Sequence, residues 1–409
     1  MSEQLLPSPS PSPTPTPTSP LPPIPPELSY VAKGAYGCVI KPALPNRVNN
    51  YEDWTQYPNN VTKLFFKKGN MKKAYTNSQT MYNLLGRNNG HKTQKYRHKY
   101  RSSNIPNNVR TRCKKIGRNV KLYTLRMKNL GNDFWALDKD HKYKKYRTIY
   151  VGTLLDQILK VMKQLQILVV RKIIHGDVRE TNLMIHPETG IITLIDFDLL
   201  YPVDTYFDKV SLGFYCHPPE TLLYKDFKYF INATSAEINT KLAKREIDSK
   251  LEKYSKHHLK FQFAKPQYLN RKAKKSQLKS ALKDSIFYFT TCMDPDDSNS
   301  ELQKALGNIL LPSYDSYGLA FTLLEFLTFV YPSVTIRVQE ERFSASLKSR
   351  ISNNGIPYTD EQIIQIRTSL HSLVEVLEPM ADLRVQRRMN IHTGVERMEA
   401  IVKEFHARM

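Results

Sequence analysis

The chain has 409 residues and a formal net charge of +23 at pH 7, from 61 Lys and Arg against 38 Asp and Glu. Its length exceeds one ordinary domain, which excludes a small single-domain module. So positive a charge favours a polyanionic partner such as nucleic acid, or else a basic surface without a dedicated partner.

Cysteine usage and hydropathy predict a soluble, intracellular protein. The four cysteines have no C-x-x-C spacing, which argues against zinc and against a disulfide framework and fits a reducing compartment. The N-terminus has no apolar signal region. The longest apolar stretch, Leu319–Val330, is short and contains Glu325, so it predicts a buried helix and no membrane span.

The first 27 residues are rich in Pro, Ser and Thr. Proline at every second or third position blocks both helix and sheet, so residues 1–27 are predicted to form a disordered tail. A plain spacer is the simpler interpretation, although its Ser-Pro and Thr-Pro pairs are also candidates for phosphorylation.

A glycine-containing turn between two strands, Val31–Lys41, opens the folded part. Glycine allows backbone N–H groups to approach a phosphate, but a plain β-hairpin explains the same pattern. Lys63 then lies inside the apolar strand pattern Val61–Phe66, where a lysine needs an anionic partner to offset its desolvation. Solvent exposure on an alternating strand is the alternative.

A predicted helix, Lys72–Leu85, precedes a basic insertion at residues 86–118 with Tyr among Lys and Arg. That alternation suits stacking on nucleic acid, but a solvated insertion is the simpler account. The strand pattern resumes at Val120–Met127. Leu154–Val170 has apolar residues at three-and-four spacing and is predicted to be a long helix.

The stretch Ile173–Ile185, followed by Thr193–Asp198, contains two apolar runs of strand length that carry three polar side chains: Asp177, Asn182 and Asp196. The first run leads into a polar loop, and the second, Ile191–Ile195, ends at Asp196. Phosphoryl transfer needs such a set. One carboxylate accepts the proton of the attacking hydroxyl, while an amide and a second carboxylate hold Mg²⁺ on the nucleotide phosphates.

The signature H-x-D-x-[KR]-x-x-N, followed by a strand ending in D-F-x, resembles the catalytic and metal-binding loops of the protein-kinase superfamily. The resemblance implies an α+β, two-lobed fold. A small, β-rich N-lobe would span residues 28–130, including the insertion at 86–118. A larger helical C-lobe would span 131–409, with a second basic insertion at 225–310.

The resemblance also implies the roles of individual residues. Asp177 would be the catalytic base, Arg179 would stabilise charge on the transferred phosphoryl group, and Asn182 and Asp196 would hold Mg²⁺. ATP would be bound by a further set on the N-lobe and hinge: Gly34, Ala35, Tyr36, Gly37, Val39, Lys63, Met127 and Leu130.

The hinge M-x-x-L-G and the sequence His-Gly-Asp resemble the casein kinase one and vaccinia-related kinase group. A Lys-, Asn- and Tyr-rich composition with a Pro-rich tail is similar to the protein kinases of large DNA viruses. That similarity would imply a viral protein located in the host cytoplasm or the virion.

Three positions depart from the family pattern. The helix Lys72–Leu85 offers no Glu near Ser78 to pair with Lys63, which argues for reduced activity. Gly176 replaces the arginine that usually meets a phosphate on the activation segment, so activation by phosphorylation is less expected. Asp198 replaces the glycine that usually follows Asp-Phe.

Two further elements resemble the parts of protein kinases that build a platform for a peptide substrate. Pro218-Pro219-Glu220 resembles the A-P-E motif, and Asp315 resembles the aspartate that caps the backbone of the catalytic loop. By the same resemblance, Arg384 or Arg387 is the candidate partner of Glu220.

The sequence therefore predicts an ATP-dependent Ser/Thr protein kinase with a protein substrate. A small-molecule kinase of the aminoglycoside or choline type shares H-G-D-x-x-x-x-N followed by I-D-F-D and stays an alternative. A pseudokinase scaffold or nucleic-acid binder is the third, because the helix Glu is missing and the insertions are basic.

Overall fold

The computed structural model describes residues 29–33, 37–41, 60–85, 94–101, 105, 107–113, 120–128, 130–134, 150–186, 188–209, 217–221, 245, 249, 271–293, 297–331, 352–353 and 356–409. The predicted tail, 1–27, lies outside these residues, and so do residues 225–270 of the predicted insertion at 225–310, apart from positions 245 and 249. So does the tip of the glycine-containing turn at residues 34–36.

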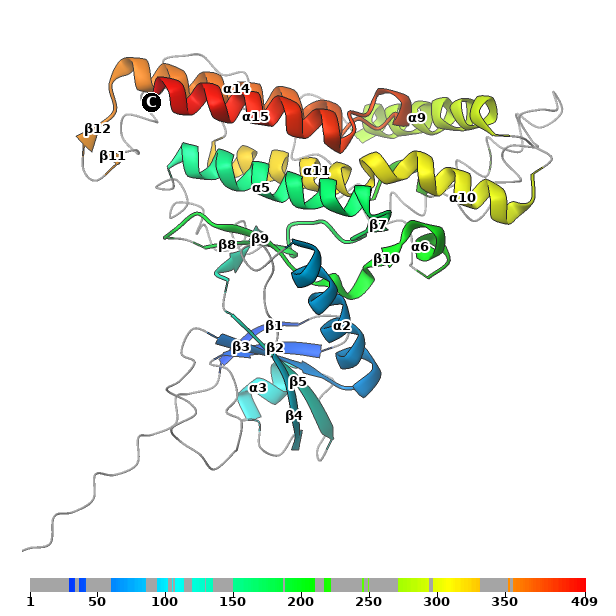
Figure 1. The fold of residues 1–409 in the computed structure, drawn as a ribbon, viewed down its shortest axis with the longest axis vertical. Coiled ribbons are helices and arrows are strands. Elements are labelled where there is room, and N and C mark those ends of the chain that lie inside the picture. Colours follow the sequence, from blue (N-terminus) through cyan, green and yellow to red (C-terminus); the bar gives the residue numbers. More distant parts are fainter. Residues whose placement is uncertain are drawn as a thin grey trace, which may run out of the picture. The chain divides into compact units, whose positions relative to one another are not determined.

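The chain forms two compact units (Figure 1). The first comprises residues 1–68 and 94–128, and the second comprises residues 69–93 and 129–409. Mixed helix and strand content, mostly helical and with small sheets, agrees with the α+β class predicted from the sequence. The assignment of the units to kinase lobes with the predicted boundaries stays a prediction.

The first unit is built on a five-stranded antiparallel sheet of order β1-β2-β3-β5-β4. Its elements are β1 Ser29–Lys33, β2 Gly37–Lys41, β3 Asn60–Phe65, β4 Gln94–Arg101, α3 Asn107–Arg112 and β5 Lys121–Lys128. Part of the segment predicted as a solvated insertion thus forms strand β4 and helix α3.

One face of this sheet carries a small core. Cys38, Ile40 and Leu64 alternate inward along β2 and β3, and they pack with apolar residues of α3 and its flanks. A disulfide joins Cys38 to Cys113 across this core. The sequence argued against a disulfide framework and did not predict this single pair, because cysteines 75 positions apart meet only once the sheet has formed.

The second unit has its main core among four helices: α5 Val151–Val170, α11 Tyr314–Val330, α14 Asp360–Met380 and α15 Ile391–Arg408. Helix α2, Lys68–Leu85, adds Met81 and Leu85 to this core. Figure 1 shows α14 and α15 side by side, packed over α5 and α11. A capping box at Thr359 satisfies the first N–H groups of α14, which sets where that helix begins.

A second core joins α6 Val203–Lys209 to α9 Arg271–Cys292 and α10 Asn299–Leu310. Both α9 and α10 lie inside the segment predicted as a basic insertion. They nevertheless bury apolar residues such as Leu278, Phe289 and Leu306 against α6 and its neighbours. This part of the segment is therefore integral to the fold.

Short strands and turns complete the second unit around residues 175–182. Strands β6 Asn132–Asp133, β8 Leu183–Ile185 and β9 Ile192–Leu194 form one sheet, and β7 Ile173–Ile174 pairs with β10 Tyr201–Pro202. The remaining elements are β11 Ser352–Asn353, β12 Ile356–Pro357 and the 3₁₀ turns η3 Phe197–Leu199, η6 Leu311–Ser313 and η7 Val385–Arg387.

The apolar stretch at residues 319–330 lies in α11, whose side chains are mostly buried, as the sequence predicted. Among the residues described, no helix has both the length and the hydropathy needed to cross a membrane.

Candidate active site

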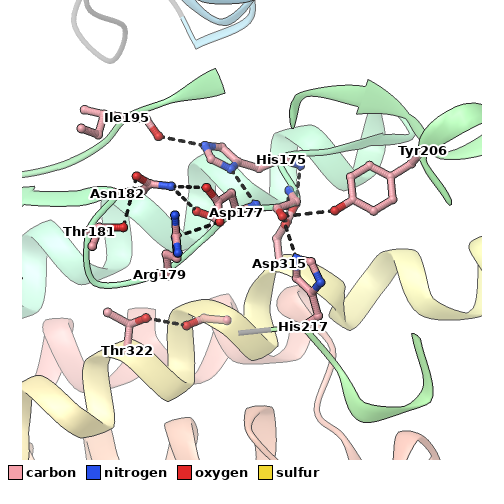
Figure 2. Close-up of polar contacts among 12 residues, drawn as sticks. His175, Asp177, Arg179, Thr181, Asn182, Ile195, Tyr206, His217, Asp315 and Thr322 are labelled. Atoms are coloured by element: carbon pink, nitrogen blue, oxygen red, sulfur yellow. Dashed lines mark hydrogen bonds and ion pairs between the residues drawn. The ribbon is translucent and has the colours of Figure 1, made fainter. Parts of the chain in front are cut away.

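The loop between β7 and β8 carries the predicted catalytic residues, and an aspartate from a distant helix holds its backbone (Figure 2). Asp315, in the first turn of α11, accepts hydrogen bonds from the N–H groups of His175 (2.7 Å) and Gly176 (2.9 Å). Burial raises the pKa of Asp315 to about 6, although both backbone donors favour its charged form. The capping role that the sequence predicted for Asp315 is confirmed by these contacts.

Asp177 is buried in this loop, and both of its carboxylate oxygens have partners. Oδ2 accepts a hydrogen bond from Asn182 Nδ2 at 2.7 Å, and Oδ1 forms an ion pair with Arg179 Nε at 2.9 Å. Burial raises the pKa of Asp177 to about 6, against the Arg179 charge, which lowers it, and with the Asp196 charge, which raises it further. Above pH 6 the group is therefore a carboxylate that can accept a proton.

Asn182 links the two polar stretches found in the sequence. Its Nδ2 also donates to the Asp177 backbone carbonyl at 2.9 Å, so both amide contacts fix the orientation of the side chain and leave Oδ1 as its acceptor. Its own backbone carbonyl accepts from Ile195 N–H at 2.9 Å. This contact brings the start of β8 beside the end of β9, where Asp196 follows.

Asp196 adopts the left-handed conformation, with φ 63° and ψ 66°, at the start of η3. Aspartate tolerates this region better than most side chains do. Burial lowers the pKa of the His175 ring to about 4, and the charge of Asp196 acts against this shift. The same charge raises the pKa of Asp177. The Asp196 carboxylate therefore lies within electrostatic reach of both groups.

The donors at this place suit Mg²⁺. A carboxylate from Asp196 and an amide oxygen from Asn182 are hard oxygen ligands, and Mg²⁺ commonly takes one or two protein ligands together with substrate phosphates. The mutual repulsion of Asp177 and Asp196 gives a cation an electrostatic reason to bind. Within the described ranges, no cluster of three or more His, Cys, Asp or Glu side chains is arranged to hold a metal alone.

Helix α2 contacts the Asp196 segment through residues that the sequence did not single out. Asn77 Nδ2 donates to the Phe197 carbonyl at 2.6 Å. Lys73 donates to the Tyr201 hydroxyl, and its ammonium lies 4.2 Å from the centroid of that ring. In place of the missing Glu, an amide and an ammonium thus tie α2 to the segment that follows Asp196.

The predicted nucleotide residues of the first unit share one face of its sheet. Val39 pairs with Lys63 across β2 and β3, and Met127 pairs with Val61 across β5 and β3, so their side chains point to the same side. Lys63 is half-buried, with its ammonium 5.3 Å from the ring centroid of Phe65. The relation of this face to Asp177 stays a prediction.

The other nucleotide candidates differ in what can be said of them. Gly34, Ala35 and Tyr36 lie outside the described residues. Gly37 must be glycine, because a Cβ there would lie 1.6 Å from the Leu64 carbonyl oxygen. Leu130 is half-buried just after β5.

Glu220 pairs with Arg388, and both side chains are fully buried. Two hydrogen bonds join the guanidinium to the carboxylate: one links Nη1 to Oε1, and the other links Nη2 to Oε2 at 3.1 Å. The prediction that Arg384 or Arg387 would fill this role is wrong. Arg384 instead pairs with Asp284 at the surface, because the 3₁₀ turn η7 carries the chain inward only at residue 388.

Two residues that sequence reasoning missed contact the Gly176 carbonyl: Tyr206 on α6 and His217 beside Glu220. The only signal in the sequence was indirect, namely the glycine standing where a large arginine is usual. Asp198, which replaces the glycine of the family pattern, is buried in η3.

Comparison with known families finds one match in this part of the chain. Residues 125–231 match the family model described as the phosphotransferase enzyme family. The matched segment is less than half of the chain and contains Asp177, Asn182, Asp196 and Glu220. The match supports ATP-dependent phosphotransfer and does not separate protein substrates from small molecules. None of the curated proteins compared with the chain matches it.

Proposed function

We propose that the protein is an ATP- and Mg²⁺-dependent protein kinase that phosphorylates Ser or Thr hydroxyls. Asp177 accepts the proton of the substrate hydroxyl, and Arg179 beside it neutralises charge on the transferred phosphoryl group. Asn182 and Asp196 hold the metal. On the first unit, Lys63 and the face shared by Val39 and Met127 bind the nucleotide.

The observation that supports a protein as the substrate is the buried ion pair of Glu220 and Arg388. Burying two charges costs several kcal/mol per ion, and separating them again would leave an uncompensated buried charge, so the pair holds the segment that carries Glu220 in one position. It anchors the segment at residues 217–221 next to the catalytic loop, where a peptide platform lies in kinases that act on proteins. A kinase for a small molecule has no need of such a platform.

A small-molecule kinase is the second candidate, favoured by the match to the phosphotransferase enzyme family. A scaffold or nucleic-acid binder is the third, favoured by the net charge of +23 and by the absence of Glu from α2. The close association of Asp177, Asn182 and Arg179 argues against the third candidate, because binding alone gives no reason to bury a carboxylate at this cost.

The test is phosphate transfer from radiolabelled ATP with Mg²⁺. The full-length protein is offered casein, a basic protein, itself, choline and an aminoglycoside. Asp177→Asn and Asp196→Asn are nearly isosteric and remove one charge each. Asp204→Asn is the matched control, because Asp204 is an exposed aspartate on α6 of the same unit.

Label on Ser or Thr of a protein, lost in Asp177→Asn and Asp196→Asn but kept in Asp204→Asn, is the expected result. Label on choline or the aminoglycoside alone would replace the proposal with the second candidate. No transfer to any acceptor, with no shift of the unfolding temperature by Mg²⁺ and ATP, would leave the third.

A further inference from the structure

The carbonyl oxygen of Gly176, immediately before the catalytic Asp177, receives two buried hydrogen bonds (Figure 2). Tyr206 Oη donates at 3.1 Å and His217 Nε2 at 2.9 Å. The Tyr206 hydroxyl also lies 3.2 Å from that of Tyr314, at the start of α11. Since Tyr206 donates to the carbonyl, Tyr314 donates to Tyr206.

Residue 176 must be glycine for this arrangement to form. Its φ is +76°, a conformation that side chains disfavour. A Cβ there would lie 2.2 to 2.5 Å from the hydroxyl and ring atoms of Tyr206. An arginine at this position and the Tyr206 ring therefore exclude each other. The Tyr206 ring occupies the space that a side chain at position 176 would need.

Both sides of this residue are held by other elements. The Gly176 N–H donates to Asp315, while its carbonyl accepts from Tyr206 and His217, all of them buried. The Gly176 carbonyl and the Asp177 N–H belong to one planar peptide unit. Fixing the carbonyl therefore fixes the plane from which the Asp177 side chain projects.

His217 comes from the segment anchored by Glu220 and Arg388, and its ring packs 5.5 Å from that of Tyr314. The hydrogen bond from His217 thus joins the proposed peptide platform to the backbone of the catalytic base. This link runs from the His217 side chain to a backbone carbonyl and contains no phosphoryl group.

We propose that His217, together with Tyr206, is a positioning residue that orients the peptide unit preceding Asp177 and couples the segment at residues 217–221 to the catalytic base. The proposal rests on the proposed function for its effect on catalysis. It predicts that the base is held in place without phosphorylation of the chain, because the side-chain link takes the role of a phosphate contact.

The test compares three variants of the full-length protein. His217→Phe keeps an aromatic ring and removes the donor. His217→Gln restores an N–H donor, because its Nε2 is as many bonds from the backbone as that of histidine. Tyr314→Phe removes a hydroxyl from the same buried group that does not touch Gly176, and serves as the matched control.

With active wild-type protein, His217→Phe is expected to lower kcat by about tenfold or more while the KM for ATP changes by less than about twofold, since misplacing a catalytic group costs rate and not nucleotide affinity. His217→Gln and Tyr314→Phe should keep kcat within about threefold of wild type. A loss in His217→Gln equal to that in His217→Phe would overturn the proposal. So would an unchanged kcat in His217→Phe, even if that variant unfolds at a lower temperature.

Hydrogen exchange of the peptide covering residues 173–182 provides a second readout that does not depend on activity. Faster exchange in His217→Phe, with wild-type rates in His217→Gln and Tyr314→Phe, is the expected pattern. If the wild-type protein transfers no phosphate, the proposed function fails and exchange alone decides this inference. Equal exchange in wild type and His217→Phe would then refute it.

Discussion

Removing Arg388 should destabilise the protein strongly, because Glu220 would be left as a fully buried charge without a partner. Breaking one side of such a pair costs roughly 3 to 5 kcal/mol. Arg388 also donates through Nε to the Asp382 carbonyl at 2.9 Å and lies over the ring of Tyr317 at 4.9 Å, and both contacts are lost with it. The cost should therefore lie toward the upper end of that range.

Arg388→Met keeps the apolar stem and removes the charge. A loss of this size lowers the unfolding temperature by roughly 6 to 20 °C in a domain of this scale. Thermal and urea unfolding of the full-length protein measure it. The matched control is Arg384→Met, four positions earlier, because the pair of Arg384 with Asp284 is 33% and 40% exposed and should contribute less than about 1 kcal/mol.

The double variant Glu220→Met with Arg388→Met separates the buried charge from general loss of packing. With both charges removed, the protein should be more stable than Arg388→Met alone, because no carboxylate is left unpaired. A double variant less stable than the single one would refute the reasoning. So would an Arg388→Met variant no less stable than Arg384→Met.

Two further predictions concern the proposed catalytic segment. Phosphate transfer should increase as pH rises through about 6, because burial raises the pKa of Asp177 to about 6 and only its carboxylate form accepts a proton. Since the Arg179 charge lowers this pKa, Arg179→Met should move the midpoint of the profile of kcat against pH upward, and an unmoved midpoint would contradict this. Asn77→Leu should raise the Mg²⁺ concentration for half-maximal activity by about three- to tenfold. This fold-change corresponds to the free energy of the lost hydrogen bond to the Phe197 carbonyl, next to the proposed metal ligand Asp196. A Mg²⁺ titration measures it, with Thr76→Leu on the exposed side of α2 as control; equal effects of the two substitutions would disprove the link.

The parts of the site that lie close together in sequence could be predicted from it. The residue types and spacing from Asp177 to Asn182 predict a single polar loop. The β-branched strand that ends at Asp196 predicts a second polar group close to that loop. The role of Asp315 was also predictable, but only from the resemblance to a known family, since nothing in its own surroundings indicates a buried acceptor of two N–H groups.

Partners brought together by the fold could not be predicted in this way. Glu220 and Arg388 are 168 positions apart, and the register of a 3₁₀ turn decides whether residue 384, 387 or 388 faces inward. The segment holding α9 and α10 was misjudged for a related reason. Its many Lys residues dominate the composition, while the few apolar positions that make it part of the second core stand out only when α6 is beside them.

Gly176 shows how a departure from a family pattern can indicate a replacement and not a loss. From the sequence, the missing arginine implied only that one mode of regulation was absent. In the folded chain the space is filled by the Tyr206 ring, and the carbonyl that this glycine exposes is bound from two directions. Because glycine alone permits both the positive φ and the close approach, the substitution and its compensation form a single structural feature.

The missing Glu of α2 follows the same logic, since Asn77 and Lys73 tie that helix to the Asp196 segment by other contacts. Both departures therefore indicate a site held together by different contacts, and they argue against a site that has lost its function.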